Sequence, residues 1–528
     1  MKNMSDPSTS PMANAPFANE RVLKRLRRRR AADRRFKWYG RMAIGFALAA
    51  LTLLLGSIAT QAVSAATYHV VTFDLSFDKN TFGDVQPDSP PPVDRVYGLV
   101  RDDLLAEFPE TASSPALRHD LLGLVTRLAV LPVAKDLVRK PAEIGTKRRV
   151  ELPLSDDLDL FLKGAAARHL TVPVGRVKAE EIAGNVTLTS EATFARLIAA
   201  ASLENMQPPE MPGTGSILMT AGRSTIRLDS LAPSRVTGTL LTGTAQDFRT
   251  YPARARLIPA PESERTVSDL QIAWLLALKA DGRVLRVPHW SLLTHTDSTQ
   301  PELAGALAAI IGSLLTLLVT ASLAIPVGIL ASIYLEEFAP RNRITGLIEV
   351  NINNLAAVPS IVFGLLGAAV FLGAFGLPRS APVVGGLVLA LLILPVVIIA
   401  SRAALKAVPQ SIRDAALAIG ASRMQTVFHH VMPLAAPGML TGAILGMARA
   451  LGETAPLLLI GMVAFVAEVP RGPTDEATAL PVLIYSWATQ AERAWEPMTG
   501  AVILILLAFL IAMNGVVVFL RRKFERRW

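Results

Sequence analysis

The sequence predicts an α-helical integral membrane protein with six transmembrane helices and a mixed α/β domain inserted between the first and second helices. Of its 528 residues, 51% are hydrophobic and only 18% are charged, whereas soluble proteins carry about 25% charged residues. The apolar residues also gather in long uncharged stretches, and basic residues cluster beside them. The chain has no cysteine, which excludes disulfides, thiolate catalysis and cysteine-ligated metal sites.

The positive charge is concentrated at the two ends of the chain. Residues 1–41 carry a net charge of +9 and residues 521–528 a net charge of +4, within a total of +10. Basic residues beside apolar segments follow the positive-inside rule, so both ends are predicted to be cytoplasmic tails. The alternative, nucleic-acid binding by the run Arg27–Arg30, would need the charge spread over a folded face, and we expect no nucleic-acid partner.

The first predicted span is Met42–Ala66. It carries no charge over 25 residues, enough to cross a hydrocarbon core of about 30 Å at 1.5 Å per residue. The small residues Ser64 and Ala66 would also suit a signal-peptidase site, so a cleaved secretion signal is the alternative. An uncleaved anchor is favoured because six crossings place the basic ends on the same side of the membrane.

Residues 67–300 have the charge density of an ordinary globular protein, and we predict that they form a periplasmic soluble insert. Tyr68–Phe77 alternates in the manner of a strand, whereas Ser114–Val130 and Ser155–Leu170 show apolar spacing closer to that of helices. This pattern predicts a mixed α/β fold. No motif within the insert indicates what it does.

Residues 301–520 are predicted to form a membrane core with five further helices. The expected spans are Leu303–Leu335, Leu355–Leu377, Pro382–Ala400, Met439–Met462 and Met498–Leu520. The first of them, at 33 residues, would be about 50 Å long as a straight helix, so it should tilt, protrude or break near Pro326. Pro359 and Gly364 are expected to let the next span bend and its neighbours approach.

The loop at residues 402–432 is predicted to be cytoplasmic and to contain a short helix. Ser411 with Asp414 resembles the start of a capping box, and Gly420 is placed to end the helix. One face of this helix carries a small apolar stripe, made by Ile412, Ala415, Ala416 and Ile419. Such a helix docks either in a groove of another protein, to which it would pass rigid-body motion, or on the lipid surface.

Arg449 and Glu453 are the only charges in the predicted span Met439–Met462. Arg449 lies ten residues after Met439, or about 15 Å along a helix, which is near the bilayer midplane. An arginine there costs at least about 2.5 to 3.5 kcal/mol, so it needs a partner, and Glu453 would share its helix face. A guanidinium can chelate a carboxylate or two phosphate oxygens. We therefore expect Arg449 to line an anion path, the alternative being a structural ion pair that locks two helices.

Two sets of residues resemble a known family. Asp414-Ala-Ala followed by Gly420 and Pro433 is similar to the EAA loop of ABC-importer permeases, with Asp414 where Glu is usual and His430 and Met432 where Ile and Leu are usual. GMLTGAILGMARALGETAPLLLIG, SIYLEEFAP, VPSIVFGLLG and LPVLIYSWA resemble the phosphate permease subunit of the PstA type. This resemblance runs from about Ala304 to Leu520 and leaves residues 67–300 unexplained.

The resemblance implies a permease subunit of an ATP-driven phosphate importer in the bacterial inner membrane, with a transport role and no catalytic or metal site. Arg449 and Glu453 would act in the substrate pathway. The helix that Ser411 begins would couple to the ATPase through Asp414, Ala415, Ala416 and Gly420.

The expected partners are a second permease of the PstC type, an ATPase dimer of the PstB type, a periplasmic phosphate-binding protein of the PstS type and membrane lipid. No GxxxxGK[ST] loop is present in the sequence, so this chain is expected to hold no cofactor, with ATP and Mg on the partner ATPase. Alternatives are a permease for sulfate or molybdate, because a buried arginine does not distinguish among anions, and a membrane-anchored sensor. Five consecutive spans argue against the sensor.

Overall fold

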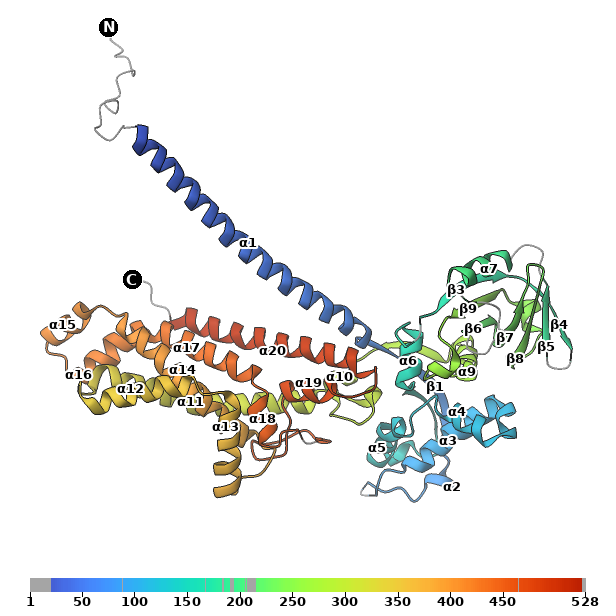
Figure 1. Cartoon of the computed structure of the whole chain (residues 1–528). Coiled ribbons are helices and arrows are strands. Elements are labelled where there is room, and N and C mark those ends of the chain that lie inside the picture. Colours follow the sequence, from blue (N-terminus) through green and yellow to red (C-terminus); the bar gives the residue numbers. More distant parts are fainter. Residues whose placement is uncertain are drawn as a thin grey trace, which may run out of the picture. The chain divides into compact units, whose positions relative to one another are not determined.

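The computed structural model describes residues 20–524, apart from residues 88, 167, 183, 184, 190–193, 205, 207–214 and 464 (Figure 1). Of the two predicted tails, residues 1–19 and 525–528 therefore lie outside the described residues. The chain divides into two units, Met1–Thr60 and Gln61–Trp528.

The first unit is dominated by helix α1, Glu20–Ala65, which is 46 residues long. It begins 22 residues before the predicted span Met42–Ala66, so the basic segment from Glu20 is helical and continuous with the apolar segment. Arginine, lysine and alanine are good helix formers, and Lys37 Nζ pairs with Asp33 Oδ2 at 2.7 Å one turn away. The basic segment is therefore a helical extension of the span.

Residues 67–300, which we call the intervening segment, belong to the second unit. They contain a three-stranded antiparallel sheet in the order β10-β1-β2. Its strands are β1 Thr67–Ser76, β2 Lys147–Pro153 and β10 Val284–Pro288. The strand expected over Tyr68–Phe77 is thus confirmed as β1. Val71, Phe73 and Leu75 are buried at alternate positions, so one face of β1 contributes to a core.

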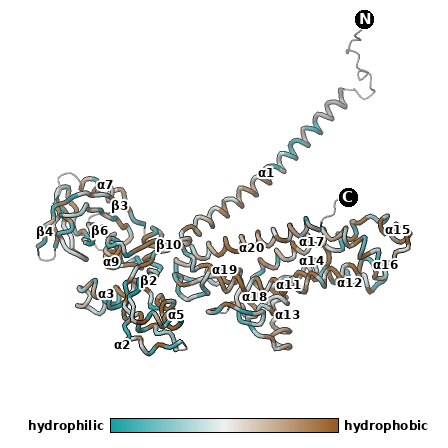
Figure 2. Tube along the Cα trace, turned by 180° about the vertical axis from the view of Figure 1, so that it is seen from behind, coloured by the Kyte–Doolittle hydropathy of each residue, from teal (hydrophilic) through white to brown (hydrophobic). Residues whose placement is uncertain are grey.

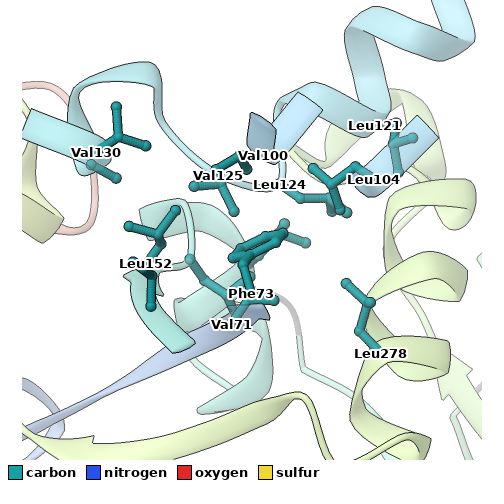
Figure 3. Close-up of a cluster of buried hydrophobic side chains, with 14 of the residues drawn as sticks. Val71, Phe73, Val100, Leu104, Leu121, Leu124, Val125, Val130, Leu152 and Leu278 are labelled. Carbon is teal, nitrogen blue, oxygen red and sulfur yellow. The ribbon is translucent and has the colours of Figure 1, made fainter. Parts of the chain in front are cut away.

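Short helices cover that face of the sheet. They are α2 Lys79–Phe82, α3 Val93–Glu107, α4 Pro115–Leu122, α5 Leu131–Arg139, α6 Asp156–Leu162 and α9 Asp269–Ala280. Figure 3 shows Val71 and Phe73 of β1 meeting Leu104 of α3 and Leu278 of α9 in one apolar cluster. The helical spacing expected over Ser114–Val130 and Ser155–Leu170 therefore corresponds to helices α4 and α6, which are shorter than those ranges.

A second, seven-stranded antiparallel sheet has the order β3-β9-β6-β7-β8-β5-β4. Its strands are β3 Leu170–Gly175, β4 Lys178–Ile182, β5 Asn185–Thr189, β6 Ser216–Ala221, β7 Ser224–Leu231, β8 Arg235–Thr242 and β9 Ala253–Ile258. Helices α7 Phe194–Leu203 and α8 Asp247–Thr250 pack against it, with Phe194 and Phe248 fully buried. The described part of the intervening segment thus has two separate apolar cores.

Glu302 is buried and Asp156 is half-buried, and the pKa values of both carboxyl groups are raised. Glu302 is 8% exposed, accepts a hydrogen bond from Thr126 Oγ1, and burial raises its pKa to about 7. Asp156, at the start of α6, has its pKa raised to about 6 by burial and by the neighbouring Asp157. Because both pKa values lie above those of an unfolded chain, the protonated forms favour folding. This stabilisation is fully present below about pH 4 and is lost as the pH rises from there to about 6 to 7.

We therefore expect the unfolding temperature of the full chain in detergent to fall as the pH is raised from 5 to 8. Glu302→Gln, which keeps the hydrogen bond to Thr126 without the charge, should remove on the order of 3 kcal/mol of this dependence. Scanning calorimetry at several pH values checks both expectations. A Glu302→Gln variant with the same pH profile as the wild type would contradict the raised pKa.

Apolar helices make up most of the second unit after residue 300. They are α11 Leu307–Ile333, α12 Arg343–Ala356, α13 Ser360–Gly367, α14 Pro382–Lys406, α17 Met432–Gly452, α18 Ala455–Leu459, α19 Leu480–Ala488 and α20 Trp495–Phe524. Among the described residues of the whole chain, five helices are long and apolar enough to cross a membrane, or up to six if one bent pair is a single span. Figure 2 shows hydrophobic residues along α11, α14 and α20.

A bent pair of helices occupies the region of the span predicted over Leu355–Leu377. Helices α12 and α13 meet at an angle of 100°, and Pro359 occupies the N-cap of α13. A proline disfavours the helical conformation of the residue before it, so the chain turns at this point. The bend expected from Pro359 is confirmed, whereas α11 continues through Pro326 without the break considered there.

The span predicted over Met439–Met462 has different boundaries. The helical path begins at Arg423 and includes α17, which ends at Gly452. The chain then breaks at Glu453 and Thr454 before the short helix α18, which has a proline in its first turn. The break places Glu453 outside the helix that carries Arg449.

Helices α11, α14, α17 and α20 lie side by side (Figure 1). Glycines of α17 face alanines of α14: a Cβ added to Gly438 would lie 2.6 Å from Ala404 Cβ, and one added to Gly442 only 2.3 Å from Ala400 Cβ. Small residues four apart let the backbones of two apolar helices approach closely. This packing fixes the register and rotation of α17 against α14.

Candidate functional site

Arg449 lies on the open face of α17. Residues at steps of three or four along this helix are exposed, namely Thr441, Leu445, Arg449 and Gly452. The antiparallel register of Gly438 against Ala404 and Gly442 against Ala400, continued along the helix, sets Arg449 level with Ile393, near the middle of α14.

The partner of Arg449 is Glu453. Arg449 Nε donates to Glu453 Oε1 at 3.5 Å, and the two side chains are 41% and 20% exposed. Glu453 is the C-cap residue of α17, with φ −84° and ψ 114°, so the prediction that both side chains share one helix face is wrong. The ion pair nevertheless forms because the chain turns back at the end of the helix.

The pair is weak by its geometry. A distance of 3.5 Å is at the limit of a hydrogen bond. Within the described part of the chain, Glu453 is the only hydrogen-bond or ion-pair partner of the Arg449 side chain. The two terminal nitrogens of the guanidinium are therefore available for bidentate binding of an anion.

The helix predicted in the loop at residues 402–432 is confirmed as α15, Gln410–Ala418. Gly420 ends it as expected, with φ +92° and its N–H donating to Leu417 O at 3.0 Å. Ser411, however, does not cap it, because the N-cap is Pro409 and Ser411 lies inside the first turn. Asp414 Oδ1 instead accepts a hydrogen bond from Gln410 Nε2 at 3.1 Å.

A capping box is present one helix later. Ser422 Oγ accepts from the N–H of Gln425 at 3.2 Å, and Gln425 Oε1 accepts from the N–H of Ser422 at 2.9 Å, at the start of α16, Arg423–Gln425. The Ser-x-x-Gln spacing is a sequence signal for this structure. The sequence analysis did not predict this capping box, because it assigned the helix start to Ser411.

The apolar residues of α15 are divided between two environments. Ala416 is buried and Ile412 packs against an apolar cluster formed by the ends of neighbouring helices. Ala415 is exposed and Ile419 is 81% exposed, beyond the C-terminal end of α15. The predicted stripe is thus partly used inside this chain, and its remainder is open to another molecule.

Three glutamates near α15 form ion pairs with arginines of α14 and α15. Sequence reasoning did not single out these glutamates. Glu336 and Glu337 lie in the π-helical turn Tyr334–Phe338 that follows α11, and Glu349 lies in α12. Arg402 of α14 bridges two of them, with Nε 3.3 Å from Glu336 Oε2 and Nη2 2.7 Å from Glu349 Oε1. The sequence did contain a signal for Glu336 and Glu337, because these two adjacent acids in the segment SIYLEEFAP directly follow an apolar span.

The described residues contain no group of three or more His, Cys, Asp or Glu side chains that could hold a metal ion.

Comparison with known proteins gives matches in both halves of the chain. Residues 324–528 match the family described as binding-protein-dependent transport system inner membrane component, and residues 23–171 match a domain of unknown function (DUF3333). The phosphate transport system permease protein PstA of Mycobacterium leprae is 33% identical over 245 residues, which cover 44% of this chain and 79% of that protein.

PstA 1 of Mycobacterium tuberculosis is 31% identical over 258 residues, covering 48% of this chain and 83% of that protein. A chain of the solved MetNI methionine ABC transporter is 16% identical, with a TM-score of 0.34, and covers 45% of this chain and 97% of that one. The family assignment therefore rests on the sequence relatives and not on the solved structure. The chain belongs to the PstA-type family of permease subunits of binding-protein-dependent ABC transporters.

Proposed function

We propose that this chain translocates inorganic phosphate as one half of the membrane pathway of an ABC importer. The observation that carries the proposal is Arg449, which lies level with the middle of α14 on an open helix face and has only a weak partner. The relatives from the two Mycobacterium species are named as phosphate transport permeases. A cation at that depth is costly in lipid, so its retention favours a function that uses the charge.

In this mechanism Glu453 and phosphate compete for the same guanidinium. When the path is empty, Glu453 neutralises Arg449 across the 3.5 Å contact. An arriving phosphate offers two oxygens to the planar fork of the guanidinium, which is a stronger and more directional interaction than the long contact with Glu453. Release follows when the carboxylate returns to Arg449. The pair therefore works as an exchangeable counter-ion site.

A complete pathway requires partner subunits. The open face of α17 suits a second permease of the PstC type, and the exposed residues Ala415 and Ile419 suit an ATPase dimer of the PstB type. ATP and Mg belong to that ATPase, and a PstS-type protein delivers phosphate from outside. In this role α15 couples to the ATPase, with Asp414, Ala415, Ala416 and Gly420 at or near the contact.

The same proposal fixes the orientation in the inner membrane. Both termini lie in the cytoplasm, because the net charges of +9 and +4 at the two ends follow the positive-inside rule. Residues 67–300 then lie in the periplasm, on the side from which phosphate arrives. This placement is consistent with a segment that has its own apolar cores.

The function is tested by uptake in a strain that lacks its own phosphate permease. Expression of this chain with its partner subunits is expected to restore uptake of radiolabelled phosphate roughly tenfold or more above that of labelled sulfate. Equal rescue of both anions would remove the assignment to phosphate. Strains that express the chain with an inactivated ATPase serve as the control.

A further inference from the structure

Arg413, which precedes the sequence Asp414-Ala415-Ala416 in α15, forms a buried ion pair with Glu337. Arg413 Nη2 lies 2.7 Å from Glu337 Oε1, and Nε lies 3.3 Å from both carboxylate oxygens. The two side chains are only 14% and 10% exposed. Because both side chains are largely buried, this contact resists separation much more than an exposed ion pair does.

The same guanidinium also binds the end of α14. Arg413 Nη1 donates to Val408 O at 2.7 Å, and Nη2 donates to Leu405 O at 3.0 Å. These carbonyls belong to the last turn of α14 and the residues that follow it, where a positive charge also interacts favourably with the helix dipole. One side chain of α15 is therefore bonded to the ends of both α11 and α14.

Apolar packing beneath the guanidinium joins the same elements. Leu405, Val408 and Val431 are buried in one cluster, and Ile412 of α15 packs against it. The polar bonds of Arg413 and this cluster together leave α15 little freedom relative to the two spans. On the other side of α15, by contrast, Ala415 and Ile419 are exposed.

We propose that Arg413 is a positioning residue that makes α15 move as one rigid body with α11 and α14. Displacement of α15 by the ATPase then moves these two spans instead of bending the loop at residues 402–432. The inference rests on the proposed coupling of α15 to an ATPase and adds the residue pair, Arg413 and Glu337, through which the motion passes.

The matched control is Arg402. It is buried to the same extent, at 15% exposed, and it pairs with Glu336 and Glu349 at the same end of the molecule. Neither partner belongs to α15. Loss of the Arg402 pairs therefore removes two ion pairs of a similarly buried arginine without releasing α15 from the spans.

The experiment uses the complete transporter in proteoliposomes, with this chain, the second permease, the ATPase and the binding protein, and with inorganic phosphate as substrate. We expect Arg413→Gln to lower phosphate transported per ATP hydrolysed roughly tenfold, a size typical of coupling between sites. ATP hydrolysis and co-purification of the ATPase should persist. Arg402→Gln should keep the wild-type ratio, and exchanging the charges, with Arg413→Glu and Glu337→Arg together, should recover part of it.

A wild-type ratio in Arg413→Gln would overturn the proposal, as would an equal fall in Arg402→Gln. If Arg413→Gln does not assemble, Arg413→Lys and Glu337→Gln are measured in the same way, and a wild-type ratio in both overturns it. Failure of the proposed function itself is distinguishable, because the wild-type transporter would then fail to move phosphate at all.

Discussion

Arg449→Gln is expected to lower phosphate uptake at least about tenfold while the amount of assembled permease stays the same. Hydrogen bonds to a charged group contribute about 1.5 to 3 kcal/mol each, and a bidentate anion makes two of them with the guanidinium. Glutamine stays polar but loses the charge and the fork. Uptake of labelled phosphate, normalised to the permease recovered from membranes, measures the effect.

The variants that accompany it separate a transport role from a structural one. Arg449→Lys keeps the charge without the planar fork, so it should retain part of the uptake. Arg379→Gln removes an exposed arginine in a loop of the same membrane core, and we expect normal uptake. If Arg449→Gln loses assembled permease in proportion to uptake, the ion pair is a structural lock and the pathway assignment is wrong.

Gly442→Leu is expected to destabilise the membrane core by about 3 kcal/mol or more, because overfilled contacts between packed helices force backbones apart. A Cβ at Gly442 would already lie 2.3 Å from Ala400 Cβ, and the remaining leucine atoms have no room. The variant should unfold at lower temperature in detergent and elute as aggregate. Thermal stability followed by size-exclusion chromatography measures the change.

The control for this variant is Gly515→Leu in α20. A Cβ at Gly515 meets nothing within 4 Å, and leucine favours a helix more than glycine does. We expect no loss of thermal stability. Should Gly442→Leu be as stable as the wild type, the close approach of α14 and α17 would be contradicted.

The spans themselves were predictable because a bilayer demands long uncharged helices. The prediction of Pro382–Ala400 corresponds to α14, which extends to Lys406. Helix breaks were harder to predict, since hydropathy averaged over a window does not register Glu453 and Thr454 between two apolar helices. Pro456 in the first turn of α18 was the available signal, just as Pro359 correctly indicated the bend after α12.

The candidate site was partly predictable for the same kind of reason. A lone arginine near mid-membrane is conspicuous in the sequence, and its contact with Glu453 is present in the structure. The role of Glu337 was not predictable, because its partner Arg413 lies 76 residues later in the chain. Only the fold brings the end of α11 against α15, so no local spacing in the sequence encodes the pair.

The length of α1 has a consequence for where charge resides around the membrane. A helix of 46 residues rises on the order of 70 Å, more than twice the hydrocarbon thickness of about 30 Å. If the helix crosses the bilayer near the membrane normal, its apolar half fills the hydrocarbon core and the basic half before Met42 lies outside it. The positive charges of that half are then placed to interact with anionic lipid headgroups.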